Sequence, residues 1–264
     1  MAIEVKNLRF CYGGRPVIGD VSFTAEKGEL LAVLGPNGVG KSTLFRCLLG
    51  FLEPVSGEIL AEGKPLSGYS RRELARKIAY IPQSHTPAFD HTVLDSVLMG
   101  MTAQLGVFEQ PGGLQREKAM QMLRALGLEK LADRGCMKIS GGERQLMLLA
   151  RALVQDASML IMDEPTANLD YGNSCRVMER VQQLGRQGYT IIFSTHDPNQ
   201  AFSYATKVLA LKDGGVMASG APRDVLTEAV LSQLYGIPVA RCEVQTKRGT
   251  KTICMPMPGG EEDN

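Results

Sequence analysis

The sequence predicts an α/β fold with a parallel sheet at its core, and three observations lead to this prediction. Short apolar runs, typical of strands buried on both faces, occur within residues 30–34, 158–165 and 189–195. Helical patterns separate these runs, and such alternation favours parallel strands joined by helices. The first run leads directly into a glycine-rich segment, residues 35–42, which matches a phosphate-binding pattern found between a strand and a helix.

Ahead of this core, residues 3–25 carry short apolar runs with partial alternation, and Gly13-Gly14 lies between them. This pattern predicts an antiparallel sheet, with a turn at the glycines, at the edge of the nucleotide site. Residues 29–82 then continue into the parallel core. Near the other end of the chain, residues 212–215 read Lys-Asp-Gly-Gly and predict a tight turn between two short strands.

The glycine-rich segment fills every fixed position of the pattern G-x-x-x-x-G-K-[ST]. Its glycines allow the backbone N–H groups to surround phosphate oxygens at the positive end of the following helix. Lys41 is placed for the β- and γ-phosphates, Ser42 for a Mg²⁺ ion and Thr43 for the α-phosphate. The pattern predicts a nucleoside triphosphate site; its residues are Gly35, Pro36, Asn37, Gly38, Val39, Gly40, Lys41 and Ser42.

Polar residues follow three other apolar runs, where ligands collect in open parallel sheets. Asp163 is expected to hold Mg²⁺ through water, and Glu164 to polarise the attacking water. His196 is assigned to the γ-phosphate or the attacking water, and Gln83 to Mg²⁺ and water. Each residue alone also fits a structural or solvated strand end, and the phosphate-binding segment upstream favours the catalytic interpretation.

From Thr92 the pattern turns helical, and Thr92 with Asp95 forms a helix-start signal. A loop is expected over residues 101–113, followed by a helix from about Leu114 to Leu126. Residues 88–150 therefore look like a helical insertion between two core strands.

A second anion site is predicted at residues 140–145, which read Ser-Gly-Gly-Glu-Arg-Gln. Ser140 and Glu143 satisfy the capping-box pattern and predict a helix from Gly141 to Val154. Two glycines leave the helix start open, so its N–H groups and positive dipole can accept a γ-phosphate. Because this chain offers no second nucleotide for that end, the segment predicts half of a site that a second subunit completes.

Composition argues against a nucleic-acid-binding protein, a membrane-spanning protein and a zinc protein. The net charge of +1 gives no bulk attraction to nucleic acid. No apolar run approaches the roughly 20 residues that cross a bilayer, and the N-terminus lacks a signal pattern, so a soluble cytoplasmic chain is expected. The six cysteines show no C-x-x-C spacing, which predicts reduced thiols and no zinc site. Residues 259–264 are expected to form a disordered acidic tail.

These elements, in this order, resemble the nucleotide-binding subunit of ABC transporters over roughly residues 2–240. The resemblance implies a P-loop NTPase (RecA-like) core, an N-terminal antiparallel β subdomain and the ABC-specific helical insertion in a domain of residues 1–240, with a short C-terminal extension at 241–264. The family's motifs map onto Gly35 to Thr43 (Walker A), Gln83 (Q-loop), Ser140 to Gln145 (signature), Met159 to Glu164 (Walker B), Asn168 to Asp170 (D-loop) and His196 (H-loop).

The resemblance implies an ATPase in which two copies sandwich two ATP molecules and drive membrane subunits. Tyr12 matches the aromatic residue that stacks on adenine, and Phe10 is the alternative. The catalytic set is Glu164, His196, Gln83 and Lys41. The Mg²⁺ set is Ser42, Gln83 and Asp163. The ATP-binding set is Tyr12, Gly35, Pro36, Asn37, Gly38, Gly40, Lys41, Ser42, Thr43, Ser140, Gly141, Gly142, Glu143 and Asp170.

The chain departs from the family pattern at Ile139, where leucine is usual, at Glu143, where glutamine is common, and at Asn168, where alanine is more frequent. None of these changes removes a phosphate ligand. Glutamate at the Glu143 position is frequent among metal-chelate importers, so this departure favours that group.

Further runs look like the motor subunits that energise uptake of iron–siderophore complexes, haem and cobalamin; they are residues 70–83, 92–100, 168–173 and 234–239. The implied partners are a second copy, transmembrane permease subunits and, indirectly, a substrate-binding protein, with no nucleic acid, at the cytoplasmic face of the cell membrane. Residues 84–100 are expected to face the permease, with packing in the core as the alternative for their apolar members. Alternatives are an importer motor for another cargo such as molybdate, a soluble ABC ATPase acting on DNA or ribosomes, and a metabolic kinase.

Overall fold

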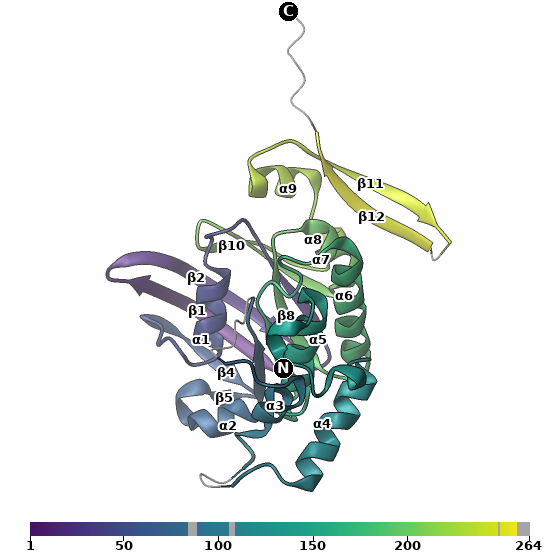
Figure 1. Cartoon of the computed structure of the whole chain (residues 1–264). Coiled ribbons are helices and arrows are strands. Elements are labelled where there is room, and N and C mark those ends of the chain that lie inside the picture. The colour runs from purple at the N-terminus through teal and green to yellow at the C-terminus, as the bar shows by residue number, and fades with distance from the viewer. Residues whose placement is uncertain (84–88, 106–108, 248, 258–264) are drawn as a thin grey trace, which may run out of the picture. The chain divides into compact units, whose positions relative to one another are not determined.

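The computed structural model describes residues 1–83, 89–105, 109–247 and 249–257 (Figure 1). The chain packs as two compact units. The first unit combines Met1–Pro65 with Ile192–Asn264, and the second comprises Leu66–Ile191. The acidic tail predicted at 259–264, and residues 84–88 of the predicted permease-facing segment, lie outside the described residues.

The antiparallel sheet predicted at the N-terminus is confirmed in the first unit. Strands β1 (Ile3–Tyr12) and β2 (Arg15–Ala25) pair antiparallel through a turn at Gly13 and Gly14, whose φ angles of 52° and 83° suit a two-residue hairpin. Strands β4 (Ser56–Ala61) and β5 (Lys64–Pro65) complete the order β2-β1-β4-β5.

The parallel core of the first unit contains β3 (Leu30–Leu34), β8 (Thr190–Thr195), β9 (Lys207–Lys212) and β10 (Gly215–Gly220), in the order β10-β9-β3-β8. Every residue of β3 and β8 is buried, as their continuous apolar runs predict. The predicted turn between β9 and β10 is present, with positive φ at Asp213 and Gly214. The chain passes from the second unit into the first within β8.

Helix α1 (Lys41–Leu48) follows β3, and α7 (Pro198–Tyr204) follows β8. The chain then forms α8 (Pro222–Val225), α9 (Glu228–Tyr235) and an antiparallel hairpin of β11 (Val239–Thr246) and β12 (Gly249–Pro256), with α9 beside β11 (Figure 1). This hairpin has no counterpart in the sequence-based expectations. The predicted domain boundary near residue 240 stays a prediction.

In the second unit, strands β6 (Ile78–Ile81) and β7 (Met159–Met162) pair in parallel, and all of β7 is buried. The predicted helix at 114–126 is α4 (Gly113–Ala125), and the predicted helix at 141–154 is α5 (Gly141–Leu153). The other helices are α2 (Arg71–Ala75), α3 (Val93–Leu98), α6 (Tyr171–Arg186) and the 3₁₀ turns η1 (Leu66–Gly68), η2 (Met99–Met101), η3 (Glu129–Leu131) and η4 (Cys136–Lys138).

The helix-start signals of the second unit are also confirmed. Thr92 caps α3, with its hydroxyl accepting from the Asp95 amide at 3.1 Å. All six cysteines are free thiols, and Cys47 and Cys175 lie in α1 and α6. Across the described residues, no helix combines the length and the apolar character that a membrane span requires.

Candidate active site

The phosphate-binding segment joins β3 to α1 in the first unit, as the sequence predicts. Lys41 is only 5% exposed, and its ammonium group folds back over the segment. It donates to the carbonyl oxygens of Gly35 at 2.8 Å and of Pro36 at 3.1 Å. These carbonyls hold the charged side chain across the loop, and its contact with phosphate stays a prediction.

Two glycines are required by this loop for different steric reasons. Gly40 caps α1 at φ 109°, a conformation that other residues rarely adopt, and a Cβ there would lie 2.9 Å from Ile18 Cδ1. A Cβ at Gly35 would lie 2.7 Å from the carbonyl oxygen of Leu211. The loop is therefore shaped by its packing against the surrounding strands of the first unit.

The start of α1 is suited to an anion. It carries no side-chain cap and no acidic residue in its first turn, whereas α5 and α6 each begin with a side-chain cap. An uncapped helix start presents N–H groups and the positive end of the helix dipole. Ser42 and Thr43, the predicted Mg²⁺ and α-phosphate contacts, belong to this turn.

Two aromatic rings compete for the predicted adenine contact at the end of β1. Phe10 is 7% exposed and belongs to the core, while Tyr12 is 43% exposed. The rings meet edge to face with centroids 4.8 Å apart. Tyr12 is therefore the more accessible ring of this pair, and buried Phe10 packs against it.

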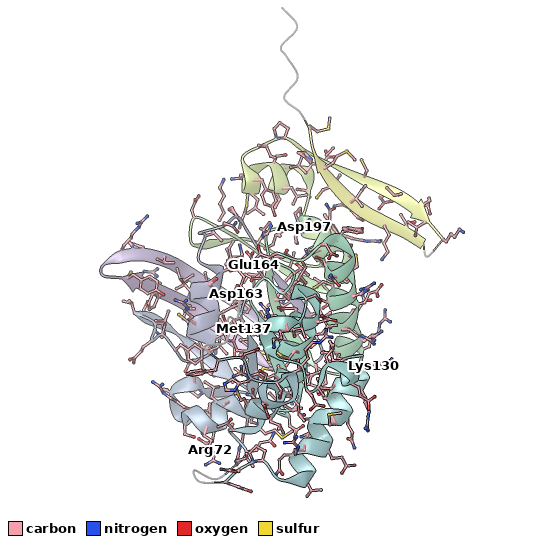
Figure 2. The ribbon with its side chains drawn as sticks, in the orientation of Figure 1. Arg72, Lys130, Met137, Asp163, Glu164 and Asp197 are labelled. Atoms are coloured by element: carbon pink, nitrogen blue, oxygen red, sulfur yellow. The ribbon has the colours of Figure 1, made fainter. Side chains whose placement is uncertain are left out.

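His196 directly follows β8, and its side chain is exposed. The backbone around it is tightly bonded. The hydroxyl of buried Thr195 accepts from the amide of Asp197 at 3.0 Å and donates to Gln200 Oε1 at 3.0 Å. Asp197, labelled in Figure 2, then caps α7. The carbonyl of His196 accepts from the hydroxyl of Tyr235 at 2.9 Å, a contact that sequence reasoning missed.

In the second unit, Asp163 and Glu164 follow β7 (Figure 2). The side chain of Asp163 is almost fully buried, with an exposed fraction of 4%. Glu164 adopts φ 42°, a left-handed conformation that costs a residue other than glycine about 1–3 kcal/mol and that concentrates at functional sites. Gln83 Nε2 donates to Glu164 Oε2 at 3.3 Å, so the structure brings together two predicted catalytic residues from neighbouring strand ends.

The predicted capping box at the start of α5 is confirmed. Ser140 Oγ accepts from the Glu143 amide at 3.3 Å, and Glu143 Oε2 accepts from the Ser140 amide at 2.7 Å. The backbone hydrogen bond from Ser140, followed by the bond from its side chain, lowers the pKa of the Glu143 carboxyl. The box uses the amides of Ser140 and Glu143 and does not involve those of the two glycines between them.

Both glycines of this segment lie against residues at the start of α6 or just before it. A Cβ at Gly142 would lie 2.6 Å from Asn173 Cγ, and a Cβ at Gly141 would lie 3.3 Å from Leu169 Cδ2. Gly142 is thus required by close packing as well as by the openness of the helix start. Asn173 is a second residue that the sequence-based site prediction missed, because nothing local marks it.

Asp170, a predicted nucleotide contact, caps α6. Its carboxylate accepts from the Asn173 amide at 2.8 Å and from Asn173 Nδ2 at 2.6 Å, and these bonds lower its pKa. The next residue, Tyr171, is 87% exposed. The carboxylate therefore has a structural role in this unit, and its contact with nucleotide stays a prediction.

The residues that the sequence assigns to Mg²⁺ carry side-chain oxygens of the kind that this ion prefers. No group of three or more His, Cys, Asp or Glu side chains within the described part of the chain is arranged to hold a metal. Mg²⁺ bound with a nucleotide, however, takes only one or two carboxylates besides phosphate and water oxygens. The buried carboxylate of Asp163 suits that role.

Comparisons with known proteins agree on the family to which this chain is similar. The family model described as ABC transporter matches residues 18–167. A probable iron chelatin transport ATP-binding protein from Helicobacter pylori is 38% identical, covering 90% of this chain and 94% of the relative. The molybdate import ATP-binding protein MolC of Haemophilus influenzae is 36% identical over 97% of this chain and 96% of the relative.

Among solved structures, a protein described as a metal-chelate type ABC transporter in an inward-facing conformation matches with a TM-score of 0.88. It is 36% identical, and the match covers 97% of each chain.

Proposed function

This chain belongs to the ABC transporter family, and on that premise we propose that it is the motor subunit of an importer for a metal chelate of the iron–siderophore, haem or cobalamin type. It is an ATP-binding and ATP-hydrolysing protein that works with permease subunits. The similarity to a metal-chelate type transporter over 97% of the chain supports the choice of cargo.

ATP binding is assigned to the first unit. Lys41 contacts the β- and γ-phosphates, the N–H groups of residues 35–43 surround the phosphate oxygens, and Tyr12 stacks on adenine. The buried position of Lys41, its bonds to two loop carbonyls and the uncapped start of α1 support this assignment. The exposed ring of Tyr12, beside buried Phe10, supports the adenine contact.

Magnesium is assigned to Ser42, Gln83 and Asp163. When bound, the ion neutralises charge on the β- and γ-phosphate oxygens. Hydroxyl, amide and carboxylate oxygens are the hard ligands that Mg²⁺ prefers. The position of Asp163 directly after β7, next to Glu164, supports its place in this set.

Hydrolysis is assigned to Glu164, which polarises the attacking water, with His196 contacting the γ-phosphate or that water. The contact between Gln83 and Glu164 is the observation that carries this assignment, because it orients the carboxylate from a second strand end. The left-handed backbone of Glu164 supports it further, since strain of this kind collects where geometry serves chemistry.

A second copy of the chain completes each ATP site through Ser140, Gly141, Gly142 and Glu143, with Asp170 at the same interface. The box at the start of α5 supports this, because it stabilises the helix start without using the amides of the two glycines. Closure of the two copies on ATP then moves the permease subunits at the cytoplasmic face of the membrane, and a substrate-binding protein delivers the cargo to them.

Replacing Glu164 tests the catalytic assignment. Glu164→Gln retains the shape and the hydrogen bond from Gln83 but removes the carboxylate, so kcat is expected to fall at least tenfold, on the order of a general base's contribution. Binding of a fluorescent ATP analogue is expected to stay within about twofold, because the phosphate-binding loop is untouched. Retained turnover in Glu164→Gln would remove Glu164 from the mechanism.

The cargo has a second candidate, molybdate, because the molybdate import relative is 36% identical over nearly the whole chain. Reconstitution of the complete transporter in vesicles separates the two cargoes. ATPase stimulation by a binding protein loaded with an iron chelate, and not by one loaded with molybdate, is expected. The opposite pattern would reassign the cargo while leaving the ATPase intact.

A further inference from the structure

The side chain of Tyr235 reaches the backbone of His196 from the last turn of α9. Its hydroxyl donates to the His196 carbonyl at 2.9 Å across a sequence separation of 39 residues. Burial, followed by the nearby Cys254 and Asp197, raises the pKa of the Tyr235 hydroxyl, so the group keeps its proton and acts as the donor. This bond ties the residue after β8 to the C-terminal part of the chain.

The bond supplies a restraint that the local sequence does not. Thr195 and Asp197 are held by short-range hydrogen bonds around the start of α7. The Tyr235 bond fixes the carbonyl of His196 itself. It thereby fixes the peptide plane next to the Cα atom that carries the exposed imidazole. Only two backbone dihedrals per residue are soft, so one such bond restricts the directions that the side chain can take.

Helix α9 is itself firmly anchored, which makes Tyr235 a fixed donor. Ser232 Oγ accepts from the Val239 amide at 2.9 Å, and Glu228 Oε1 accepts from the Arg241 amide at 2.6 Å. Gly236 ends the helix in a left-handed cap. These bonds join α9 to the start of β11.

The other strand of the hairpin is bonded to the helix that follows His196. Asn199 Nδ2 donates to the Cys254 carbonyl at 3.1 Å, and the Cys254 amide donates to Asn199 Oδ1 at 2.8 Å. Such a reciprocal pair is the pattern of a strand ladder, made here by one side chain. We call α9, β11 and β12 together the C-terminal clamp, because α9 is bonded to His196 and β12 is bonded to α7.

We propose that Tyr235 is a positioning residue for His196, and that through it the C-terminal clamp sets the rate of ATP hydrolysis. The inference rests on the role proposed above for His196. Tyr235 acts on the backbone of His196 and touches no residue of the phosphate-binding loop in the contacts described. Loss of the Tyr235 hydroxyl therefore lowers the rate of ATP hydrolysis and leaves ATP binding intact.

Two substitutions on the same helix separate positioning from stability. Tyr235→Phe removes the hydroxyl that holds His196. Ser232→Ala removes one of the two side-chain hydrogen bonds that join the same helix to β11, and the bond from the Arg241 amide to Glu228 still holds the helix in place. Both variants are expected to lower the thermal midpoint by similar, small amounts, since each loses a single neutral hydrogen bond.

Kinetics provide the first readout, on the full-length chain. Tyr235→Phe is expected to lower kcat about fivefold, the equivalent of one neutral hydrogen bond used in the transition state. Its affinity for a fluorescent ATP analogue is expected to stay within about twofold, and Ser232→Ala is expected to keep kcat within about twofold. Equal kcat values in the two variants would overturn the proposal.

Nuclear magnetic resonance of the imidazoles provides the second readout. The chain has only three histidines, so the ring signals of a histidine-labelled sample are simple to assign with His196→Ala. Tyr235→Phe is expected to move the His196 signal, and Ser232→Ala is expected to leave it in place. An unmoved His196 signal in Tyr235→Phe would contradict the positioning role even if kcat fell.

The His196→Ala variant also distinguishes this proposal from the one on which it rests. If His196→Ala hydrolyses ATP slowly while Tyr235→Phe is as fast as the wild type, the clamp has no positioning role and the assignment of His196 stands. If His196→Ala is as fast as the wild type, the assignment of His196 itself is wrong, and the positioning role is overturned with it.

Discussion

The side-chain amide of Gln83 donates to the carboxylate of Glu164 at 3.3 Å, across a sequence separation of 81 residues. The two residues follow β6 and β7, which pair in parallel, so their strand ends meet at one edge of the second unit. A carboxylate that accepts such a bond is held in one orientation, and this is the orientation from which Glu164 is proposed to act.

Removing the amide donor tests whether this orientation matters. Gln83→Ala is expected to lower kcat about tenfold, because the carboxylate loses its restraint and the proposed Mg²⁺ set loses one oxygen. The dissociation constant of a fluorescent ATP analogue, measured without Mg²⁺, is expected to stay within about twofold. A loss of Mg²⁺-free binding equal to the loss of kcat would instead indicate that the substitution disturbs the whole unit.

The close approach of Gly142 to Asn173 predicts a steric conflict that a second substitution relieves. Gly142→Ala is expected to lower the free energy of unfolding by about 1–3 kcal/mol, since its Cβ would lie 2.6 Å from Asn173 Cγ. The double variant with Asn173→Ala lacks the two closest atoms, Cγ and Oδ1, and keeps only the approach to Cβ at 3.0 Å. In denaturant unfolding it is therefore expected to be more stable than the sum of the two single losses predicts.

Gly141→Ala provides the matched control for that experiment. Its Cβ would meet only the end of the Leu169 side chain at 3.3 Å, which can move aside. Gly141→Ala is therefore expected to lose less unfolding free energy than Gly142→Ala. A larger loss at Gly141 than at Gly142 would contradict the packing described here.

Two capping boxes in the second unit allow stability and catalysis to be separated. Ser70 caps α2 with Glu73 in the same reciprocal pattern that Ser140 and Glu143 form at α5. Ser140→Ala and Ser70→Ala are each expected to cost about 1 kcal/mol of unfolding free energy. Only Ser140→Ala is expected to reduce ATPase activity as well. Equal activities in the two variants would restrict Ser140 to capping.

The box at α5 also predicts a dependence of stability on pH. The pKa of the folded Glu143 carboxyl lies below its ordinary value of 4.5, so its stabilising effect is complete above that value and is lost as pH falls through the lower, folded pKa. The stability difference between wild type and Glu143→Gln, measured by urea unfolding, is therefore expected to be larger at pH 7 than below about pH 4. A difference that grew on acidification would contradict this sign.

Tyr12 and Phe10 are expected to respond to substitution in opposite ways. Tyr12→Ala is expected to weaken ATP binding by the roughly 1–3 kcal/mol of one base–aromatic stack, with little change in thermal stability. Phe10→Ala removes a ring that is 7% exposed, and is expected to cost about 3–5 kcal/mol of unfolding free energy. Unchanged nucleotide affinity in Tyr12→Ala would end its assignment to adenine.

Features that depend on neighbours in the chain were predictable from the sequence. The turn at Gly13-Gly14, the strand–loop–helix around Lys41 and the reciprocal cap of Ser140 and Glu143 all arise from residues a few positions apart. Local sterics and short-range hydrogen bonds determine these features, so the residue types at these positions predict them directly. The buried strands were predictable for a related reason, since continuous apolar runs leave few other solutions.

The amino-acid sequence by itself determined the α/β class, the phosphate-binding loop and the list of polar residues at strand ends. Tertiary structure decided which of them meet: Gln83 with Glu164, Gly142 with Asn173, and His196 with Tyr235. It also decided that residues 239–256 form a hairpin held to α7 by Asn199. These contacts join residues tens of positions apart, so they exist only once packing has fixed the elements that carry them, and no local preference encodes them.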